Sequence, residues 1–373
     1  MALASASGSL PRVLVVGAGV AGLATARALR RAGFRPEVVE SRSAVDANAA
    51  GMYLPGNAAR ALRALDLDHP VRPLGQVVYR QLFLDAAGDR LCEVDLTRLW
   101  AGVGECRALP VAELQRVLIT SIGGNVRYDT RVTRLDIGEQ AVTVGFADGQ
   151  FAEYDLVVGA DGRRSVVRAL AALGGSPRTT GQVVYSGVLN GGPVVTEWTG
   201  LLGHRARFVV VPIGARRLYW EADEAGESLP ADPVARLRSV FGGYGGPVPR
   251  ILAGVEKAEA TLTGEVELGR WSRGRVVLVG DAAHATGPSL AQGAAMALED
   301  AVVLAQSLRV NADVDAALTT YERRRRPRAQ WVRHRTRDRD RTRDVSPELR
   351  DPLLRRRGAR IFEDHYRLLV DPL

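Results

Sequence analysis

Short apolar runs that end in glycine are the most regular feature of this chain. The first run, Val13 to Val16, is rich in β-branched residues and predicts a strand buried on both faces. Helical spacing continues from Ala21 to Arg31 and stops at Gly33, before a second short strand from Glu37 to Val39. This order of strand, helix and strand is typical of an α/β fold.

Elsewhere the chain alternates between apolar and polar positions, which predicts antiparallel strands. One alternating block spans residues 76–94 with a hairpin turn at 85–89, and a meander spans 126–158 with a tight turn at Asp148-Gly149. A third block spans residues 182–223. We expect the first and third blocks to form sheets outside the first β–α–β unit.

Two later apolar runs also break into glycine and an acid. Leu156 to Val158 leads into Gly159-Ala160-Asp161-Gly162, and Val276 to Val279 leads into Gly280-Asp281 and then a helix that extends to Leu308. An acid beside flexible backbone at the carboxyl end of a strand lies where open α/β sheets bind ligands. The turn around Asp161 is therefore a candidate binding element.

The composition indicates a folded protein without a membrane span. The chain has 373 residues and ordinary hydrophobic content, which suits one large domain or two intertwined domains. No apolar run is long enough to cross a bilayer, and the segment before Val13 does not resemble a signal peptide. Cys92 and Cys106 lack metal-type spacing and are expected to be buried in a reducing compartment. We therefore expect a soluble cytoplasmic protein with no metal site.

The formal charge of +8 comes from one segment of the chain. Residues 323–343 contain eleven arginines against Asp338 and Asp340. Such a run can bind nucleic acid, but it lacks interleaved aromatic residues apart from Trp331, and arginine replaces lysine almost everywhere in this chain. We therefore predict a solvated helical face here rather than a nucleic-acid site.

The turn after the first strand, Gly17-Ala18-Gly19-Val20-Ala21-Gly22, has the spacing of a dinucleotide-binding loop. The first glycine allows the tight turn, the second leaves room for a pyrophosphate, and the third lets the helix pack close to the strand. Unpaired amides at the helix N-terminus favour phosphate oxygens. Glu40, at the end of the second strand, can accept hydrogen bonds from an adenosine ribose. The arrangement suits NAD or FAD and disfavours NADP, whose 2′-phosphate the acid would repel.

Three motifs together resemble those of the single-component flavin-dependent aromatic hydroxylases, the para-hydroxybenzoate hydroxylase family. They are GAGVAG with Glu40, VVGADGRRSVVR, and VVLVGDAAHATGPSLAQGAAMALEDA. The resemblance covers nearly the whole chain, and the length and layout are especially similar to those of the bacterial FAD-dependent urate hydroxylases. It implies a Rossmann-like FAD-binding domain interrupted by an antiparallel-sheet substrate domain, with C-terminal helices. The implied FAD-binding segments are 1–75, 100–180 and 266–320, the substrate sheet is 76–99 and 181–265, and the helical tail is 321–373.

The resemblance also implies the chemistry. FAD is expected to be noncovalent, with NAD(P)H as a transient reductant, and a C4a-hydroperoxyflavin formed with O2 transfers one oxygen atom to an aromatic or heteroaromatic small molecule. Epoxidation of an alkene, a flavin dehydrogenase and a non-oxygenating flavoprotein remain alternatives. The implied partners are a small-molecule substrate and O2, without nucleic acid or membrane, and the implied assembly is a monomer or homodimer.

Site residues follow from the same resemblance. It assigns the pyrophosphate to the glycine turn, the adenosine ribose to Glu40 and Ser41, and adenine to the backbone of Val132. Asp161 and Gly162 are implied near the phosphates and in NAD(P)H use, and Asp281 at the ribityl chain. The implied cofactor-binding set is Gly17, Gly19, Ala21, Gly22, Glu40, Ser41, Val132, Asp161, Gly162, Asp281, Pro288, Ala291, Gln292, Gly293, Ala294 and Ala295.

The implied catalytic set is Arg207, Tyr219 and Pro288. Gly214 and Ala215 predict a hairpin turn that would bring Arg207 and Tyr219 within reach across paired strands, where the arginine could hold an anionic substrate. A surface cation–π contact is the alternative explanation for this pair. One departure from the family is Val111, where an arginine is usual, and Arg107 is not expected to replace it.

Overall fold

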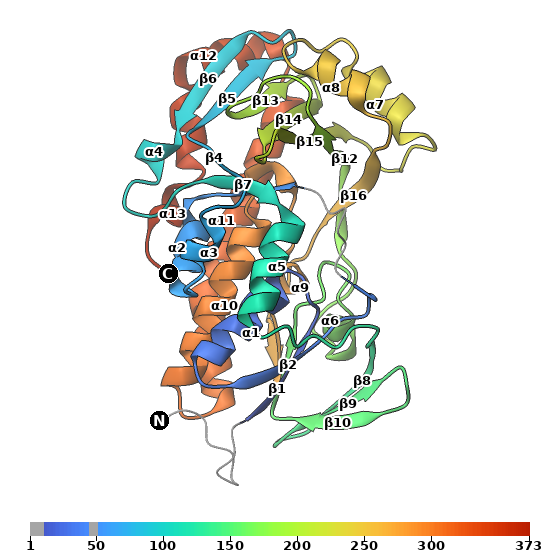
Figure 1. Ribbon diagram of the computed structural model, residues 1–373, viewed down its shortest axis with the longest axis vertical. Helices are drawn as coiled ribbons and strands as arrows, with labels where there is room; N and C mark the ends of the chain where they lie inside the picture. Colours follow the sequence, from blue (N-terminus) through green and yellow to red (C-terminus); the bar gives the residue numbers. More distant parts are fainter. Residues whose placement is uncertain (1–10, 45–50) are drawn as a thin grey trace.

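The computed structural model describes residues 11–44 and 51–373. Figure 1 shows a mostly parallel sheet in the lower half of the view and a larger, mostly antiparallel sheet in the upper half. The segment before the first strand and the polar loop after Glu40 lie largely outside the described residues. None of the helices in the described ranges is both long and apolar enough to cross a bilayer.

The five-stranded sheet contains the three apolar runs that the sequence predicts as strands. Its order is β17 (Ser272–Arg273), β18 (Val276–Leu278), β11 (Leu156–Gly159), β1 (Arg12–Val16) and β2 (Arg35–Val39). All but β17 are parallel. Their carboxyl ends therefore meet at one edge of the sheet, which brings the turns at Gly17, Asp161 and Asp281 together.

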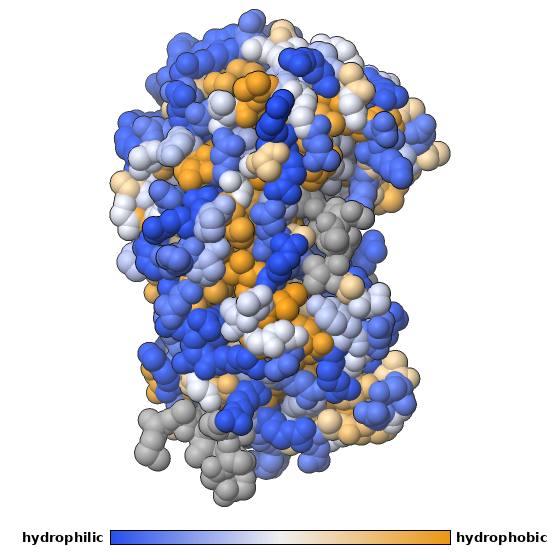
Figure 2. All heavy atoms as spheres, in the orientation of Figure 1, coloured by the Kyte–Doolittle hydropathy of each residue, from blue (hydrophilic) through white to orange (hydrophobic). Residues whose placement is uncertain are grey.

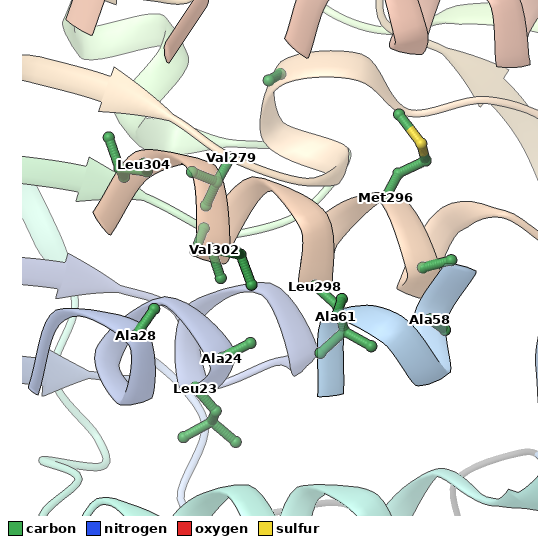
Figure 3. Packing of buried hydrophobic residues seen from close by; sticks show 14 of the residues in the cluster. Leu23, Ala24, Ala28, Ala58, Ala61, Val279, Met296, Leu298, Val302 and Leu304 are labelled. Atoms are coloured by element: carbon green, nitrogen blue, oxygen red, sulfur yellow. The ribbon is translucent and has the colours of Figure 1, made fainter. Parts of the chain in front are cut away.

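Small residues let the helices pack closely on this sheet. Figure 3 shows Ala24 and Ala28 of α1 (Val20–Arg31), and Ala58 and Ala61 of α2 (Gly56–Ala64), facing α10 (Gly293–Val310). All four alanines are nearly inaccessible to solvent, and they belong to the larger of the two hydrophobic cores. Close helix packing fixes the start of α10 relative to the glycine turn, which is what a shared binding site requires.

The seven-stranded sheet draws strands from two separate parts of the chain. Its order is β16 (Glu259–Glu265), β12 (Arg178–Asn190), β15 (Arg217–Ala225), β14 (Ala206–Pro212), β13 (Trp198–Leu202), β5 (Arg80–Asp85) and β6 (Arg90–Asp95). The second core lies on one face of this sheet, under α7 (Pro233–Phe241) and α8 (Val248–Gly254). The opposite face packs in part against the larger core, and it also carries the polar side chains Arg207, Glu221 and Asp223.

Two three-stranded sheets and several short helices complete the connections. The meander β8 (Val132–Ile137), β9 (Val142–Phe146) and β10 (Phe151–Tyr154) turns at Asp148-Gly149 as predicted. The other small sheet is β3 (Gly51–Leu54), β7 (Arg107–Pro110) and β4 (Gln76–Val77). The remaining helices are α3 (Asp68–Val71), α4 (Leu96–Leu99), α5 (Val111–Ser121), α6 (Val166–Leu170), α9 (Asp281–His284) and the 3-10 helix η1 (Pro288–Leu290). Cys92 and Cys106 are free and buried, as expected.

The arginine-rich segment belongs to one long helix, α11 (Val314–Asp344), followed by α12 (Pro347–Asp364) and α13 (Arg367–Val370). The prediction of a solvated face is wrong for five of its eleven arginines, which are buried: Arg325, Arg328, Arg333, Arg339 and Arg343. Acids on other elements neutralise four of them, as Asp223 of β15 does for Arg343, whereas Arg339 contacts the Tyr366 hydroxyl and aromatic rings. Polar residues nevertheless cover most of the face drawn in Figure 2.

Candidate active site

The glycine turn between β1 and α1 is held in a conformation that needs glycine. Gly17 has a φ of +109°, and its amide donates to the carbonyl of Val39 at 2.8 Å. A Cβ at Gly17 would lie 2.4 Å from the carbonyl oxygen of Ala160, and one at Gly22 would lie 1.8 Å from the carbonyl oxygen of Gly17. The turn is therefore packed against the strand on one side and against the Asp161 turn on the other.

Gly19 differs from these two glycines because its missing side chain faces open space. A Cβ added there meets no atom of residues 11–44 or 51–373 within 4 Å. Gly19 is also the N-cap of α1, which has no side-chain cap and no acid in its first turn. Open space beside uncapped helical amides is the arrangement that binds a phosphate group. Residues 17–22, including Ala21, thus fit a dinucleotide pyrophosphate.

Glu40 reaches back from the end of β2 to the glycine turn. Its Oε2 accepts the amide of Ala18 at 2.9 Å, and its Oε1 accepts the amide of Arg42 at 3.0 Å. Burial raises the pKa of Glu40, but these two hydrogen bonds and the Arg42 guanidinium lower the pKa overall. The hydroxyl of Ser41 also donates to Oε1, at 3.3 Å. Glu40 is thus a fixed, ionised acceptor beside the turn, as a ribose contact requires.

Val132 follows a segment that runs along the end of β2. The amide of Thr130 donates to the carbonyl of Glu40 at 2.8 Å, two residues before Val132 begins β8. The side chain of Val132 is buried. The structure therefore brings this position to the same end of the sheet as Glu40.

The carboxylate of Asp161 accepts hydrogen bonds from the beginning of α6, the helix that follows it. Oδ2 accepts the amides of Val166 and Val167 at 2.6 and 3.0 Å, and Oδ1 accepts the Ser165 hydroxyl at 2.5 Å. Asp161 therefore caps α6, and what it offers a ligand is backbone rather than carboxylate. Gly162 beside it has a φ of +81° and open space at the Cβ position.

Arg168 joins two of the three turns, and the sequence analysis did not identify it. It is 2% exposed, and its Nη2 donates to the carbonyl of Arg163 while Nη1 donates to the carbonyl of Ala282. Its position at the end of the second motif, VVGADGRRSVVR, was the only indication in the sequence. The side chain fixes the Asp161 turn against α9.

Asp281 lies at the start of α9 and beside the start of α10. A Cβ at Gly293 would lie 3.9 Å from Oδ1 of Asp281. The side chain of Asp281 is exposed, yet desolvation by the surrounding protein raises its pKa, while His284 and Arg163 lower it. The Asp281 carboxylate is accessible to solvent but has protein around it, which is the environment expected of a group that faces a ligand. α10 has no side-chain cap and no acid in its first turn, so its amides face the same place.

The backbone that carries Asp281 is fixed by Asp300 of α10. Oδ2 of Asp300 accepts the amide of Gly280 at 2.8 Å and contacts Nε2 of His284 at 2.7 Å. Gly280 has a φ of +58°, and a Cβ there would lie 2.8 Å from the Cβ of Ala21. His284 is therefore engaged inside the fold, in agreement with a structural role.

The segment between α9 and α10 is shaped for close approach. Pro288 begins η1, and Ala291 follows it with a left-handed φ of +50°. Gln292 is 2% exposed and its Oε1 accepts from the side chain of Asn57 at 3.0 Å. Ala294 is partly exposed and Ala295 is buried. The predicted flavin-side residues thus form one continuous stretch of backbone at the start of α10.

Arg207 and Tyr219 share the face of the seven-stranded sheet that borders this stretch. The hairpin between β14 and β15 forms as predicted, but the two residues are not opposite each other: Arg207 pairs with Asp223, and Tyr219 pairs with Val211. The expectation that Arg207 and Tyr219 face each other across the strand pair is therefore wrong, because Glu221 lies between them. Nη1 of Arg207 contacts the carbonyl of Ser289 at 3.5 Å, which joins this face to η1.

Glu221 is the member of this face that the sequence analysis missed. Its Oε2 accepts the hydroxyl of Tyr219 at 3.1 Å, and its Oε1 contacts Nη2 of Arg207 at 3.4 Å. Burial raises the pKa of Glu221, and Arg207 partly offsets this effect. The period of two along β15 places Tyr219, Glu221 and Asp223 on one face, so strand alternation could have identified it.

Val111 lies near the Tyr219 face, because it follows Pro110, whose strand partner Gly51 packs against Tyr219. Arg107 belongs to a different region. Val111 is the first residue of α5, and Nη1 of Arg107 donates to the carbonyl of Leu74 at 2.8 Å. Arg107 lines a cavity of about 650 Å³ together with Trp100 and Cys106. It is committed to that cavity, in agreement with the expectation that it does not replace the usual arginine.

This fold and this site together define an FAD-dependent monooxygenase. A parallel sheet presents a glycine turn, an acid for ribose and a Gly-Asp turn at one edge, beside an antiparallel sheet. The chain belongs to the family described as FAD binding domain, whose sequence profile matches residues 11–336. FAD is the cofactor of this family, and the open space at Gly19 and the enclosed carboxylate of Asp281 fit it.

Curated relatives and solved structures agree with this assignment. The chain is 35% identical over 328 residues to aurachin C monooxygenase/isomerase of Stigmatella aurantiaca, and the alignment covers 85% of each of the two chains. It is 32% identical over 333 residues to FAD-dependent urate hydroxylase of Klebsiella pneumoniae, covering 84% of this chain and 85% of the relative. The crystal structure of Klebsiella pneumoniae HpxO with FAD and uric acid superposes with a TM-score of 0.84 at 27% identity, covering 96% and 95% of the two chains.

Reversing the charge of Glu40 tests the ribose site. Glu40→Arg should lower the affinity for FAD at least about tenfold, equivalent to ~1.4 kcal/mol, because an acceptor is lost and a bulky donor fills its place. The ratio of flavin to protein absorbance after purification and a titration of apoprotein with FAD measure this. Glu139→Arg, the same charge reversal at an exposed position, is the control. Equal FAD affinity in the two variants would contradict the assignment.

Removing the carboxylate of Asp281 tests the other end of the cofactor site. Asp281→Ala should lose FAD or activity and change the free energy of unfolding little, because the N-cap of α9 is Gly280 and not Asp281. Asp315 is also an acid in the first turn of a helix, and Asp315→Ala is the matched control. A variant that is less stable by the ~1 kcal/mol of a lost cap, yet fully flavinated and active, would show a structural role instead.

Proposed function

We propose that this protein is an NAD(P)H- and FAD-dependent monooxygenase that inserts one oxygen atom from O2 into an aromatic or heteroaromatic small molecule. The observation that carries the proposal is the contact between Arg207 and Ser289, which joins the polar sheet face to the flavin-side backbone at the start of α10. Bound FAD, once reduced, supplies the activation of O2 and the transfer of the oxygen atom. The protein supplies binding, orientation and exclusion of water.

Under this proposal the three turns and the segments beside them would hold the cofactor as follows. Gly17, Gly19, Ala21 and Gly22 hold the pyrophosphate, Glu40 and Ser41 the adenosine ribose, and the backbone of Val132 the adenine. The backbone at Asp161 and Gly162 lies toward the phosphates and bears on NAD(P)H use, and Asp281 holds the ribityl chain. Pro288 and residues 291–295 surround the flavin ring. The partial positive charge of the α10 N-terminus favours negative charge on that ring.

The substrate lies against the sheet face of Arg207 and Tyr219, with Pro288 beside it. Relatives of this chain are named for acting on urate, 3-amino-4-hydroxybenzoate and 6-hydroxynicotinate, which are small electron-rich rings. The division into FAD-binding segments 1–75, 100–180 and 266–320, a substrate sheet of 76–99 and 181–265, and helices from 321 onward is consistent with this placement. We expect a cytoplasmic monomer or homodimer.

Oxygen labelling tests the proposal. Purified protein with FAD, NADH or NADPH and ¹⁸O₂ should convert a member of a panel of aromatic and heteroaromatic rings to a product that contains one ¹⁸O atom. The same compound should stimulate NAD(P)H oxidation with little release of peroxide. A compound that is oxidised without label incorporation would indicate a dehydrogenase, and no stimulated oxidation with any compound would indicate a flavoprotein that is not an oxygenase.

A further inference from the structure

The polar face of β14 and β15 exposes its carboxylate and buries its guanidinium. The side chain of Glu221 is 17% exposed, whereas Arg207 is 7% and Asp223 is 1% exposed. Nε of Arg207 donates to Oδ2 of Asp223 at 2.7 Å, which holds the guanidinium toward the interior. A ring that reaches this face therefore meets Glu221 and Tyr219 before it meets Arg207.

The charge on this face is already balanced without a ligand. Arg207 contacts both Glu221 and Asp223, and Arg343 of α11 pairs with Asp223. Asp340 of α11, which accepts the hydroxyl of Ser289, adds a third acid. Among the described residues, two arginines thus face three acids, so neither of them is left over for a carboxylate substrate. Arg339 lines a small cavity with Arg207 and Asp340, but it is engaged with the Tyr366 hydroxyl and the Phe362 ring. An anionic ring would be repelled where a neutral ring is not.

Glu221 is also held in one position by two donors. Tyr219 donates to one carboxylate oxygen and Arg207 contacts the other. Each oxygen of a carboxylate can accept more than one hydrogen bond, so both retain capacity for a ligand. Because the carboxylate is ionisable and largely buried, a donor on the substrate would form a charge-assisted hydrogen bond with it.

We propose that Glu221 is the substrate's hydrogen-bond acceptor, and that it selects uncharged rings with an O–H or N–H donor over rings with a carboxylate. The inference rests on the proposed function for the location of the substrate and deepens it. When the ring donor is acidic enough, its O–H or N–H bond breaks, the proton moves to the carboxylate, and the ring keeps the electron pair. Arg207 is then a positioning residue for Glu221 rather than the group that holds an anion.

Ligand binding to the oxidised holoenzyme tests this inference without turnover. The probes are matched pairs, 4-hydroxybenzamide with 4-hydroxybenzoate and 4-hydroxyquinoline with quinoline-4-carboxylate, titrated by the change in flavin absorbance. The wild type should bind the uncharged member of a pair at least about tenfold more tightly. Glu221→Gln keeps the shape: its oxygen can still accept from Arg207, and its amide NH2 can donate to the Tyr219 hydroxyl in place of the present bond. FAD content should not change, while the preference should fall by about tenfold or more.

Glu224→Gln is the matched control, because it makes the same change on the opposite face of β15, where Glu224 accepts from the Tyr185 hydroxyl, so it should retain the preference. The inference is overturned if Glu221→Gln keeps the full preference, if the wild type prefers the carboxylates, or if the wild type binds neither uncharged probe. Incorporation of ¹⁸O reports on the proposed function separately. Binding preference without label incorporation would leave Glu221 assigned and remove the monooxygenase.

The pH dependence of binding gives a second readout. Charged or titratable groups near Glu221 are Arg207, Tyr219, Asp223 and Asp340, together with Arg343 on Asp223. Since burial raises the pKa of Glu221, the affinity for 4-hydroxybenzamide should be full above that pKa and fall as the pH drops through it. Glu221→Gln should remove this dependence, and Glu224→Gln should retain it. A wild type and a Glu221→Gln variant with the same pH profile would overturn the assignment.

Discussion

Replacing Arg325 with methionine should lower the free energy of unfolding by about 3–5 kcal/mol, because it leaves buried acids without their partner. Arg325 is 1% exposed, and its Nε and Nη1 contact Asp300 and Glu299, both 0% exposed, at 2.7 and 2.6 Å. Arg328 also pairs with Glu299, so Asp300 is the acid that loses most. Since Asp300 holds the amide of Gly280, the Asp281 turn should loosen as well.

The control for this change lies two residues earlier on the same helix. Arg323 is exposed, and Arg323→Met should change the free energy of unfolding by no more than about 0.5 kcal/mol. Urea denaturation of both holoenzymes at saturating FAD measures the difference. Equal losses in the two variants would contradict a role for the buried pairs.

The same network predicts how stability depends on pH. Burial raises the pKa of Asp300, but His284 and Arg325 lower it overall, and Arg325 and Arg328 do the same for Glu299. A lowered pKa in the folded state means that the stabilisation is complete above the ordinary values of 3.8 and 4.5. It is lost as the pH falls through the lower folded values. In Arg325→Met this acid-dependent loss should be smaller.

The sequence predicted the parts of the fold that depend on local chemistry. A strand buried on both faces is a continuous apolar run, so β1, β11 and β18 could be read directly from Val13–Val16, Leu156–Val158 and Val276–Val279. The glycine turn was equally visible, because Gly17 adopts a φ that other residues avoid. Each of these features depends only on residues that are close neighbours in the sequence.

The burial of the arginines could not be predicted in this way. Their composition suggested solvent, yet Arg343 pairs with Asp223, which lies 120 residues away, and Arg325 pairs with acids 25 and 26 residues away. Whether a charge is buried depends on a partner that the tertiary fold supplies, and no local period records it. A buried arginine is tolerated only because these partners are present.

The β14–β15 hairpin could be predicted from the sequence only in part: its turn was predicted, but its register was not. The turn residues predicted a hairpin, and it formed, but the number of residues in the turn sets which side chains face each other. Arg207 and Tyr219 therefore share a face without being partners. Strand alternation alone would have added Glu221 to the candidate site, since it is two residues from Tyr219.

Gly22→Ala should abolish FAD retention and destabilise the apoprotein, because the added Cβ would lie 1.8 Å from the carbonyl oxygen of Gly17. Backbone on one side and the Ala160 side chain on the other leave no room for it. Gly19→Ala is the matched variant: its φ of −74° accepts alanine, and nothing in the described chain lies within 4 Å of the new Cβ. The two changes add the same atom to the same turn, so their difference isolates what occupies the space at Gly19.

Gly19→Ala should leave the thermal midpoint of the apoprotein within a few degrees of the wild type and still weaken FAD binding by about tenfold or more, equivalent to ~1.4 kcal/mol. The added methyl group would occupy the space that we assign to the pyrophosphate. Circular dichroism melting of both apoproteins and titration with FAD separate the two effects. If Gly19→Ala binds FAD as tightly as the wild type, the open space at Gly19 does not hold the pyrophosphate. If Gly22→Ala folds and binds normally, the close contact with Gly17 is not what fixes the turn.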